Sequence, residues 1–551
     1  MTTRAPTAPL RVRWLGRVPY DESLALMRAM WERDSEDALL LVEHPPTYTL
    51  GARTDPANIL VDPASVGAAQ VRADRGGDVT FHGPGQLVGY PIVNVAMGAD
   101  AIPKHVHAIE QLVIDALAGV GIFNASRFDG YPGVWVDVEE NPRKIAAIGV
   151  RVSRGRSMHG FALNVNTDLD WFNHIVPCGI ADYPVTSVAN EGADASVRDL
   201  ADAIAVRAAR VWGDGSADRA DVAWHQRPDD LAPFSRAHSE GNGAPVRLLG
   251  RLNAAGVDTS TSLSVDQRKP EWLRVKANFG PEYRALKQTM RANDLVTVCE
   301  EAGCPNIYDC WNEGTATFMI NGSRCTRACG FCLVDTRKPE PLDAGEPARV
   351  AAATAELGLK HVVITCVARD DLSDGGAAAF AATIAAIRAT NAGTNVETLI
   401  SDCKGDAVSL DVIFAARPDV LNHNLETVAR LQRAVRPSAG YARSLAVLAR
   451  AKAAGLTTKS GVMVGLGESH EEVMGALRDL RAVGVDIVTI GQYLRPTAHH
   501  LPVARWWTRA EFDDLRAEAH ELGFAHVECS PLTRSSYHAR SAADAVQVTS
   551  R

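Results

Sequence analysis

The sequence lacks several features that would place it in a specialised class of protein. None of its apolar runs approaches the roughly 18 residues that a membrane-spanning helix needs, and no part of it is of low complexity. Its formal net charge is -9, without the basic surplus that nucleic-acid-binding proteins usually carry. The first residues, MTTRAPTAPLRVRWLG, contain no apolar core of a secretion signal. We therefore expect a cytoplasmic protein that binds neither a membrane nor nucleic acid.

The length of 551 residues exceeds what one hydrophobic core usually supports, so we expect more than one domain. The segment RPDDLAPFSRAHSEGNGAP is polar, rich in proline and glycine, and has no sustained period, as is typical of an interdomain linker. These features predict a first domain at residues 1–226, a flexible linker at 227–246 and a second domain at 247–551.

Both predicted domains are of the α/β class. In the first, apolar runs and turn signals alternate, with strands and helices intermixed. In the second, short β-branched runs at 360–367, 395–401, 418–424, 457–467 and 485–494 alternate with helical stretches such as 375–389 and 469–484. This order predicts a parallel sheet that closes fully or partly into a barrel, with its chemistry at the carboxyl ends of the strands.

Six of the ten cysteines lie between Cys299 and Cys332, which indicates a metal or catalytic site in a reducing compartment. The last three form a C-x3-C-x2-C pattern that must wrap around one centre: Cys325, Cys329 and Cys332. Three thiolates suit an iron–sulfur cluster with one iron open to another ligand. A structural zinc site needs four ligands, so the zinc alternative requires a remote fourth residue.

The C-x3-C-x2-C spacing before β/α repeats resembles the radical S-adenosylmethionine (SAM) superfamily. A second triplet precedes it in a C-x4-C-x5-C pattern: Cys299, Cys304 and Cys310. With ATFMINGSRCTRACGFC, VARDDLSDGGA, NHNLETVARL, VMVGLGE, QYLRPTAHHLPV and RSSYHA, residues 247–551 resemble the lipoyl synthase family.

This resemblance implies a partial (β/α)6 TIM-type barrel, two 4Fe-4S clusters and SAM consumed as a cosubstrate. Cys325, Cys329 and Cys332 would hold the SAM cluster. The other cysteine triplet would hold an auxiliary cluster, with Ser536 as its fourth ligand and Ser535 as the alternative. The auxiliary cluster would supply sulfur to C6 and C8 of an octanoyl chain on a protein lysine. Reduced ferredoxin or flavodoxin and iron–sulfur assembly proteins are the implied partners.

The remaining cysteines of this half, Cys366, Cys403 and Cys529, are interpreted as small buried hydrophobes. The segment ISDCKGD at 400–406 stands where relatives tend to have a proline and an aromatic residue, and ECSPLTRSSY replaces a more usual glycine before the proline. We expect these departures to affect fine substrate positioning and not the chemistry.

In the first half, Cys178 is the only cysteine, which makes it a candidate nucleophile. The stretches RGGDVTFHGPGQLVGYP, KIAAIGVRVSRGRSMHGFALNV and VPCGI resemble the lipoyl(octanoyl) transferase family over roughly residues 10–225. The implied fold is that of the biotin and lipoate protein ligases, a mixed sheet flanked by helices. The implied catalytic pair is Cys178 with Lys144, because a nearby ammonium favours the reactive thiolate.

The family's reaction moves an octanoyl group from octanoyl-acyl carrier protein through a cysteine acyl-enzyme to a lysine. The acceptors are lipoyl domains of 2-oxoacid dehydrogenases and the glycine cleavage H protein. The matching substrate-binding residues are Arg75, Gly76, Gly77, Asp78, Val79, Thr80, Phe81 and His82, followed by Ala147, Ile148, Gly149, Gly160, Phe161 and Ala162. For His82 two roles stay open, polarising the thioester carbonyl or ordering the loop.

Taken together, the two resemblances predict a bifunctional enzyme of lipoate biosynthesis. Three alternatives remain open. The second half would be a different sulfur-inserting radical enzyme, such as a biotin synthase relative, but that family lacks the upstream triplet and the terminal R-S-S-Y motif. One half would be a non-catalytic carrier-protein docking module. The first half would be an ATP-dependent ligase, for which a cysteine nucleophile is superfluous.

Overall fold

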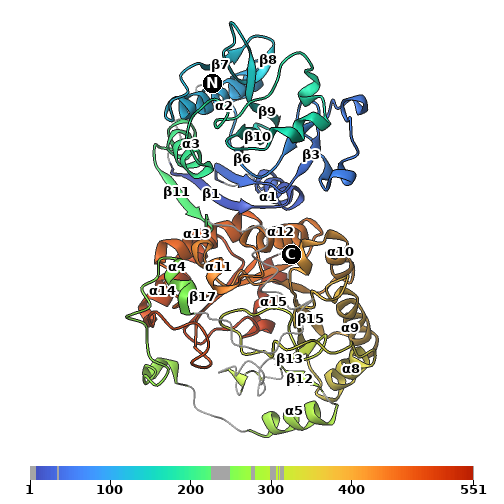
Figure 1. Cartoon of the computed structure of the whole chain (residues 1–551). Coiled ribbons are helices and arrows are strands. Elements are labelled where there is room, and N and C mark those ends of the chain that lie inside the picture. The colour runs from blue at the N-terminus through green and yellow to red at the C-terminus, as the bar shows by residue number, and fades with distance from the viewer. Residues whose placement is uncertain are drawn as a thin grey trace. The chain divides into compact units, whose positions relative to one another are not determined.

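The computed structural model of the chain describes residues 8–33, 36–224, 249–274, 280–293, 295–297, 306–307, 310 and 315–549. The chain divides into two compact units, Met1–Gln226 and Arg227–Arg551. Each unit has its own β-sheet accompanied by helices (Figure 1), which confirms the predicted α/β class. The linker predicted at 227–246 lies outside the described residues.

The first unit is built on a mixed sheet, in which the described residues form eight strands in the order β11-β1-β2-β6-β10-β9-β8-β7. β1 runs parallel to β2 and β11, whereas the pairs from β2 to β7 along the sheet are antiparallel. The bounds are β1 (Leu10–Arg17), β2 (Ala38–Glu43), β6 (Gln86–Ile92), β7 (Ala125–Phe128), β8 (Tyr131–Val136), β9 (Arg143–Ser153), β10 (Arg156–Asn164) and β11 (Ala217–Asp221). This is the mixed sheet expected from the ligase-like resemblance.

A small second sheet, in the order β4-β3-β5, completes the strands described in this unit. The glycine-rich stretch follows β4 and runs through β5, so this sheet positions much of the predicted substrate loop. Its strands and the unit's helical segments are β3 (Thr47–Leu50), β4 (Ala69–Arg72), β5 (Thr80–His82), α1 (Tyr20–Glu32), α2 (Ala101–Ala118), α3 (Val197–Trp212), η1 (Pro56–Asn58), η2 (Pro63–Val66), η3 (Leu169–His174) and η4 (Pro177–Gly179).

The second unit is built on a sheet whose strands follow one another in chain order, from β12 to β19. β12 is antiparallel to β13, and every later pair is parallel. The bounds are β12 (Val296–Thr297), β13 (Thr315–Ile320), β14 (His361–Cys366), β15 (Asn395–Leu399), β16 (Val420–Asn422), β17 (Thr458–Val464), β18 (Ile487–Gln492) and β19 (His526–Cys529). This consecutive order is that of a barrel wall. The described residues contain seven parallel strands, one more than the predicted six, because β19 extends the sheet beyond β18.

Helices connect and cover these strands (Figure 1). Two of them begin with capping boxes, in which Ser469 and Glu472 or Thr508 and Glu511 exchange side-chain and backbone hydrogen bonds. The helical segments are α4 (Leu249–Ala254), η6 (Glu271–Leu273), α5 (Pro281–Ala292), α8 (Glu346–Glu356), α9 (Ala377–Thr390), η7 (Cys403–Gly405), α10 (Ala407–Ala415), η8 (Ala429–Leu431), α11 (Gln432–Val435), α12 (Tyr441–Ala453), α13 (His470–Ala482), α14 (Arg509–Glu521) and α15 (Ala539–Thr549). In the described residues, no helix is long and apolar enough to cross a membrane.

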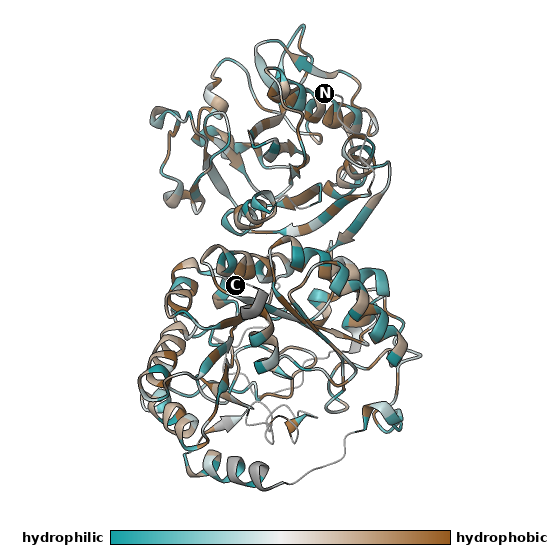
Figure 2. Cartoon of the chain, turned by 180° about the vertical axis from the view of Figure 1, so that it is seen from behind, coloured by the Kyte–Doolittle hydropathy of each residue, from teal (hydrophilic) through white to brown (hydrophobic). Residues whose placement is uncertain are grey.

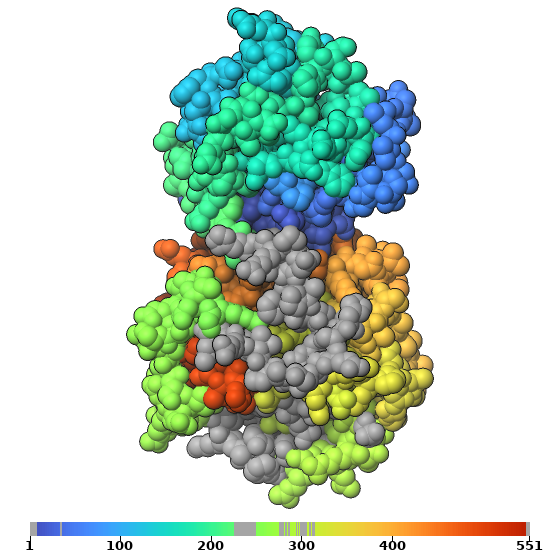
Figure 3. All heavy atoms as spheres, viewed as in Figure 1, coloured from blue at the N-terminus to red at the C-terminus, as the bar shows by residue number. Residues whose placement is uncertain are grey.

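The core of the second unit lies between the sheet and its helices. β14 has the sequence HVVITC, and β-branched residues of this kind suit a strand that is buried on both faces. Figure 2 shows the strands largely brown and the outer sides of several helices teal, as burial of the strands requires. In Figure 3 the light-green segment at 249–274 lies beside an orange-red segment on the same face of the second unit. An isolated bridge joins Leu263 to Val503.

A buried ion pair lies inside this sheet. The Nζ atom of Lys459 on β17 is 3.0 and 3.2 Å from the two carboxylate oxygens of Glu397 on β15, and both side chains are fully buried. Nδ2 of Asn422 donates to the same carboxylate at 3.1 Å. Burial alone would raise the pKa of Glu397, but Lys459 and His361 hold it below its usual value. The carboxylate of Glu397 therefore stays charged because the ammonium of Lys459 is buried beside it.

Replacing Lys459 with Met would leave that carboxylate uncompensated, and we expect the free energy of unfolding to fall by about 3–5 kcal/mol. The double variant Lys459→Met/Glu397→Leu removes both charges and should regain most of the loss. Urea unfolding followed by tryptophan fluorescence measures both. Arg540→Ala, at an exposed pair with Asp544, is the control. Equal losses for Lys459→Met and the double variant would contradict this reasoning.

Candidate functional site

The predicted catalytic pair of the first unit lines one cavity, which has a volume of about 730 Å³. Cys178 and Lys144 both line it. Most of the predicted substrate-binding residues line it as well, namely Arg75, Gly76, Gly77, Asp78, Thr80, His82, Ala147, Ile148, Gly149, Gly160, Phe161 and Ala162. Val79 and Phe81 instead pack into an apolar cluster with Tyr48. Alternation along the extended backbone explains the difference, because it turns every second side chain of this segment away from the cavity.

Cys178 is carried on a strained turn. Its φ is 57°, in the left-handed region that residues other than glycine seldom adopt. Such a conformation costs about 1–3 kcal/mol and persists where the surroundings enforce it. The N–H of Cys178 donates to the carbonyl of Val79 at 2.9 Å. The next residue, Gly179, has φ of 70°, and a Cβ there would lie only 3.0 Å from Oδ2 of Asp78. The half-buried thiol therefore stands on a fixed backbone.

Lys144 is buried near the start of β9. Its N–H donates to Pro184 and its carbonyl accepts from Thr186, each at 2.9 Å. Gly133 leaves space for the end of the side chain, since a Cβ there would lie 2.7 Å from Cε of Lys144. The Nζ atom is 5.1 Å from the centre of the Trp135 ring, within the range of a cation–π contact. No ion pair of Lys144 with a carboxylate is present in the described residues, so its charge can act on an anion in the cavity.

The contacts of His82 distinguish between its two predicted roles. Nδ1 is 2.8 Å from Oε1 of Gln86, and Nε2 is 3.1 Å from Oγ1 of Thr49. Because an amide oxygen only accepts, Nδ1 carries the proton and Nε2 accepts from the threonine hydroxyl. Burial, together with His44 and Arg75, holds the pKa of His82 well below its usual value. The neutral ring therefore has no free N–H, which favours ordering the loop over polarising a carbonyl.

Tyr20, Tyr90 and His159 also line this cavity, and the sequence did not single them out. The hydroxyl of Tyr90 is 2.7 Å from Nε2 of His44, whose Nδ1 bonds to a backbone carbonyl at 2.6 Å. Nε2 of His159 is 2.8 Å from Asp74, and its Nδ1 is 3.4 Å from the hydroxyl of Tyr20. Because these polar atoms are paired within the protein, the wall presents ring faces to an apolar chain. No local motif groups residues that lie on α1, β6 and β10.

The second unit has a cavity of about 360 Å³ at the carboxyl ends of its strands. We call residues 325–332 the cysteine loop. Its three cysteines line the cavity, together with two residues of the R-S-S-Y motif, as follows: Cys325, Cys329, Cys332, Ser535 and Ser536. Burial raises the pKa of all three thiols, to about 11 for Cys325. Thiolates here therefore need a cationic partner, as an iron–sulfur cluster provides. No group of three acidic, histidine or cysteine residues in the described ranges suits a single metal ion. An iron–sulfur cluster does not need such a group, because each thiolate binds a different iron.

Backbone hydrogen bonds hold the start of the cysteine loop. The N–H of Cys325 donates to the carbonyl of Asp335 at 2.8 Å, and the N–H of Thr326 donates to that of Ala368 at 2.9 Å. The sulfur of Cys325 in turn accepts from the N–H groups of Arg327 and Ala368, at 3.4 and 3.3 Å. Donors aimed at sulfur favour its charged form. The loop is thus prepared to present a thiolate.

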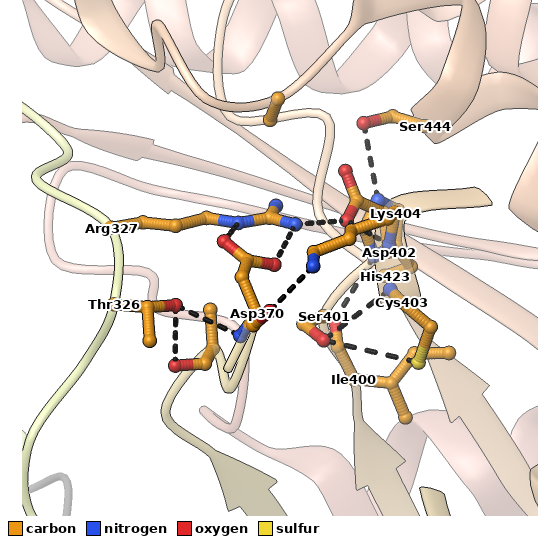
Figure 4. A network of polar contacts seen from close by, with 12 residues as sticks. Thr326, Arg327, Asp370, Ile400, Ser401, Asp402, Cys403, Lys404, His423 and Ser444 are labelled. Atoms are coloured by element: carbon orange, nitrogen blue, oxygen red, sulfur yellow. Dashed lines mark hydrogen bonds and ion pairs between the residues drawn. The ribbon is translucent and has the colours of Figure 1, made fainter. Parts of the chain in front are cut away.

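The side chain of Arg327 ties the cysteine loop to two neighbouring strands (Figure 4). Its Nε and Nη2 donate to the carboxylate of Asp370, each at 2.8 Å, and Nη2 donates to Asp402 at 2.6 Å. Asp370 follows β14 and Asp402 follows β15. Burial alone would lower the pKa of Arg327, but the two carboxylates raise it well above its usual value. The guanidinium therefore stays charged and holds the loop at the sheet edge.

The departure from the family pattern at 400–406 lies beside this anchor. Ser401 and Cys403 flank Asp402, and Cys403 and Lys404 have φ of 44° and 56°. Nζ of Lys404 donates to the carbonyl of Asp370 at 2.5 Å (Figure 4). The departing residues are thus nearer to the cysteine loop than the sequence suggested. Of the three cysteines interpreted as hydrophobes, Cys403 and Cys529 are buried, while Cys366 is half-buried and lines the cavity.

The first cysteine triplet is only partly described. Two of its members lie outside the described residues, namely Cys299 and Cys304. Cys310 is buried, and its N–H donates to the carbonyl of Asn306 at 3.0 Å. Nδ2 of Asn306 donates to the carbonyl of Leu532 at 2.6 Å. Tyr537 packs against the apolar cluster that contains Cys310. The region around Cys310 therefore contacts the segment that leads into the R-S-S-Y motif.

Family models match both units. The Lipoyl protein ligase A/B catalytic domain matches residues 19–208. The Radical SAM superfamily matches 319–480, and the N-terminal domain of lipoyl synthase of the Radical SAM family matches 255–304. Together with the cysteine loop at the mouth of a parallel sheet, these matches define a radical SAM protein preceded by a catalytic domain of the lipoyl protein ligase type.

Relatives identify the family. The lipoyl synthase of Symbiobacterium thermophilum is 59% identical over 274 residues, which cover 49% of this chain and 86% of that protein. The lipoyl synthase of Rubrobacter xylanophilus is 58% identical over 273 residues, covering 49% and 85%. The chain belongs to the lipoyl synthase family. Since its first unit adds the ligase-type catalytic domain, it is a bifunctional enzyme of lipoate biosynthesis.

Parts of the chain are also weakly similar to solved structures. A bi-partite lipoate protein ligase from Thermoplasma acidophilum has a TM-score of 0.34 at 19% identity, and the match covers 39% of this chain and 88% of that one. A methylornithine synthase has a TM-score of 0.28 at 15% identity, covering 40% and 62%.

The buried histidines of the first unit predict that its stability depends on pH. Burial lowers the pKa of His44 to about 4, whereas the unfolded chain has the ordinary value of about 6.5. Below pH 6.5 the unfolded state takes up a proton that the folded state refuses, so stability falls as pH drops toward 4. We expect a loss of about 3 kcal/mol from His44 across this window. Thermal unfolding at stepped pH measures it, and His44→Gln should flatten the curve. An unchanged slope in His44→Gln would contradict the assignment.

Proposed function

We propose that the chain makes protein-bound lipoate in two steps. The first unit transfers octanoyl from octanoyl-acyl carrier protein to a lysine of a lipoyl domain, in a 2-oxoacid dehydrogenase or the glycine cleavage H protein. The second unit then inserts sulfur at C6 and C8 of that chain. The proposal is carried by one observation, that each unit gathers the residues for its step around one cavity: Cys178 with Lys144, and the cysteine loop with Ser536.

In the first step, the thiolate of Cys178 attacks the thioester carbonyl. The new carbon–sulfur bond forms as the bond to the carrier sulfur breaks, and the ammonium of Lys144 gives its proton to that sulfur, so the carrier leaves as a thiol and Lys144 becomes a neutral amine. The ammonium of Lys144 favours the thiolate form before the attack. The amine of the acceptor lysine then attacks the acyl-enzyme, a carbon–nitrogen bond forms, and Cys178 leaves as the thiolate. Lys144 takes the proton that the amine loses.

The shape and chemistry of the cavity suit an octanoyl chain. Apolar side chains and glycine backbone line it, among them Val88, Ile148, Phe161 and Gly160. Glycine allows a close approach of the backbone to an extended chain. The side chains of Tyr20, Tyr90, His82 and His159 are already hydrogen-bonded within the protein, so a chain without polar groups leaves none of these four unsatisfied. These features support a fatty acyl substrate over a polar one.

Replacing Cys178 with Ser should lower the transfer rate by about 10³-fold or more and abolish the acyl-enzyme. Lys144→Met should lower the rate by about 10²- to 10⁴-fold, the usual contribution of a positioned acid–base group. Intact-protein mass spectrometry detects one octanoyl group on the chain and then on an added lipoyl domain, without ATP.

Lys104→Met is the matched control, because that lysine is exposed on α2. It should transfer octanoyl at the unaltered rate. A Cys178→Ser chain that still transfers octanoyl would overturn the assignment of the nucleophile. An absolute requirement for ATP would support the ligase alternative instead.

In the second unit, the thiolates of Cys325, Cys329 and Cys332 would hold the SAM cluster. Cys299, Cys304, Cys310 and Ser536 would hold the auxiliary cluster, with Ser535 as the alternative ligand. The contact of Asn306 with Leu532 supports this pairing, because it joins the upstream triplet to the terminal motif at 2.6 Å. When bound, the clusters and SAM supply one-electron chemistry that removes hydrogen from unactivated carbon, together with the sulfur.

The protein's own part in this step is to hold and shield these groups. Arg327 fixes the cysteine loop to Asp370 and Asp402. Asn424 and Glu426 line the same cavity and offer polar groups to the nucleotide. Reduced ferredoxin or flavodoxin would deliver the electron, and iron–sulfur assembly proteins would rebuild the spent cluster.

Iron and sulfide counting after anaerobic reconstitution tests the two-cluster proposal. We expect about eight irons per chain, and about four after Cys310→Ala, because cysteine ligation holds each cluster. Mössbauer spectra and a single turnover on an octanoylated lipoyl domain complete the measurement. Cys529→Ala, a buried cysteine on β19, is the control and should keep both clusters. A count of about four in the unaltered chain, with no thiolated product, would overturn the proposal.

A further inference from the structure

One hydrogen bond joins the cavity of the second unit to the terminal R-S-S-Y segment. Nδ2 of Asn424 donates to Oγ of Ser535 at 2.7 Å and to Oε1 of Glu426 at 3.0 Å. All three residues line the cavity that contains the cysteine loop. The next residue along the chain is Ser536, the proposed ligand of the auxiliary cluster. The amide of Asn424 therefore bonds the terminal segment to the wall of this cavity.

Asn424 is fixed in place by its surroundings. Nη1 of Arg436 donates to the carbonyls of Asn424 and Leu425, at 2.8 and 3.3 Å. Gly461 makes room for the amide, because a Cβ there would lie 2.9 Å from Oδ1 of Asn424. In the described residues, this Oδ1 is buried and has no hydrogen-bond partner. A molecule that enters the cavity thus meets an oriented acceptor whose own two N–H groups are already engaged.

Ser535 belongs to a short segment that also contacts the first cysteine triplet. Leu532 accepts from Nδ2 of Asn306 at 2.6 Å. Tyr537 packs against the apolar cluster that contains Cys310. The segment is therefore bonded to Asn306 on the N-terminal side of Ser535, while Ser535 itself is bonded into the cavity. Because Ser535 and Ser536 are adjacent in the chain, a shift of Ser535 also moves Ser536.

We propose that Asn424 is a positioning residue. It couples the binding of a molecule in the cavity to the ligation of the auxiliary cluster by the terminal segment. The proposal rests on the proposed function, since it takes SAM as the occupant and Ser536 as the ligand. A hydrogen-bond donor of the bound nucleotide at Oδ1 polarises the amide and strengthens its bond to Ser535. The segment is held while SAM is bound and is released when the cavity empties. The auxiliary cluster is thereby kept whole until the nucleotide has been used.

Ser535→Ala tests this coupling, because it removes the acceptor and keeps both Asn424 and Ser536. In the reconstituted full-length chain without reductant, we expect SAM to bind about 2- to 10-fold more weakly, the effect of one neutral hydrogen bond. Calorimetry measures the dissociation constant. We also expect SAM to slow the loss of auxiliary iron to a chelator in the unaltered chain but not in Ser535→Ala.

Two variants serve as controls. Ser535→Thr keeps the hydroxyl and should restore both effects. Ser530→Ala removes a hydroxyl of the same segment, bonded to Oγ1 of Thr533 at 2.8 Å, and should match the unaltered chain. If Ser535→Ala binds SAM and releases iron as the unaltered chain does, the coupling is overturned while the proposed function stands. A chain that binds no SAM at all would overturn both.

Discussion

The second unit depends on one buried guanidinium. Arg327 belongs to a loop without regular structure, yet its charge is shared between Asp370 and Asp402, which follow two adjacent strands. Buried ion pairs of this kind often add little net stability, since the cost of desolvating the charges offsets their attraction. Their value here is geometric. The ion pairs fix the loop that carries the three cysteines to the edge of the sheet. The cysteines are therefore held in position by the protein itself.

The first unit also holds its reactive residues in place. In its described residues, no buried ion pair involves Cys178 or Lys144. Its cavity must accept an apolar chain although it is walled in part by histidine and tyrosine. Hydrogen bonds such as that between His44 and Tyr90 satisfy these groups within the protein. The reactive thiol is placed by backbone strain, through the left-handed turn at Cys178 and Gly179. Both units thus position their reactive residues through the fold itself. The second unit does so by ion pairs to Arg327, and the first by the strained turn at Cys178.

The sequence predicted many of the strands, and it grouped residues that the structure brings to shared cavities, because these leave local signals. β-Branched runs marked β14 to β18, and the spacing of Cys325, Cys329 and Cys332 marked the loop. It did not predict Tyr20, Tyr90 and His159 in the first cavity, because they come together only when α1, β6 and β10 pack. It treated Val79 and Phe81 as part of a continuous binding loop, whereas the alternation of an extended backbone turns them into the core. The link from Arg327 to Asp402 was also missed, since each is an ordinary polar residue far from the other in the chain.

The contact between Asn306 and Leu532 spans 226 residues, and it bears on how the protein is made. During synthesis the upstream cysteines leave the ribosome long before the terminal segment exists. On the proposed function, the pocket for an auxiliary cluster would therefore reach its final form only when almost the entire second unit has been translated and the last strand has docked. Long-range contacts of this kind form late, because the intervening chain must first be ordered. Iron for that cluster would then be delivered to a finished fold and not to a growing chain, which would place its loading after translation.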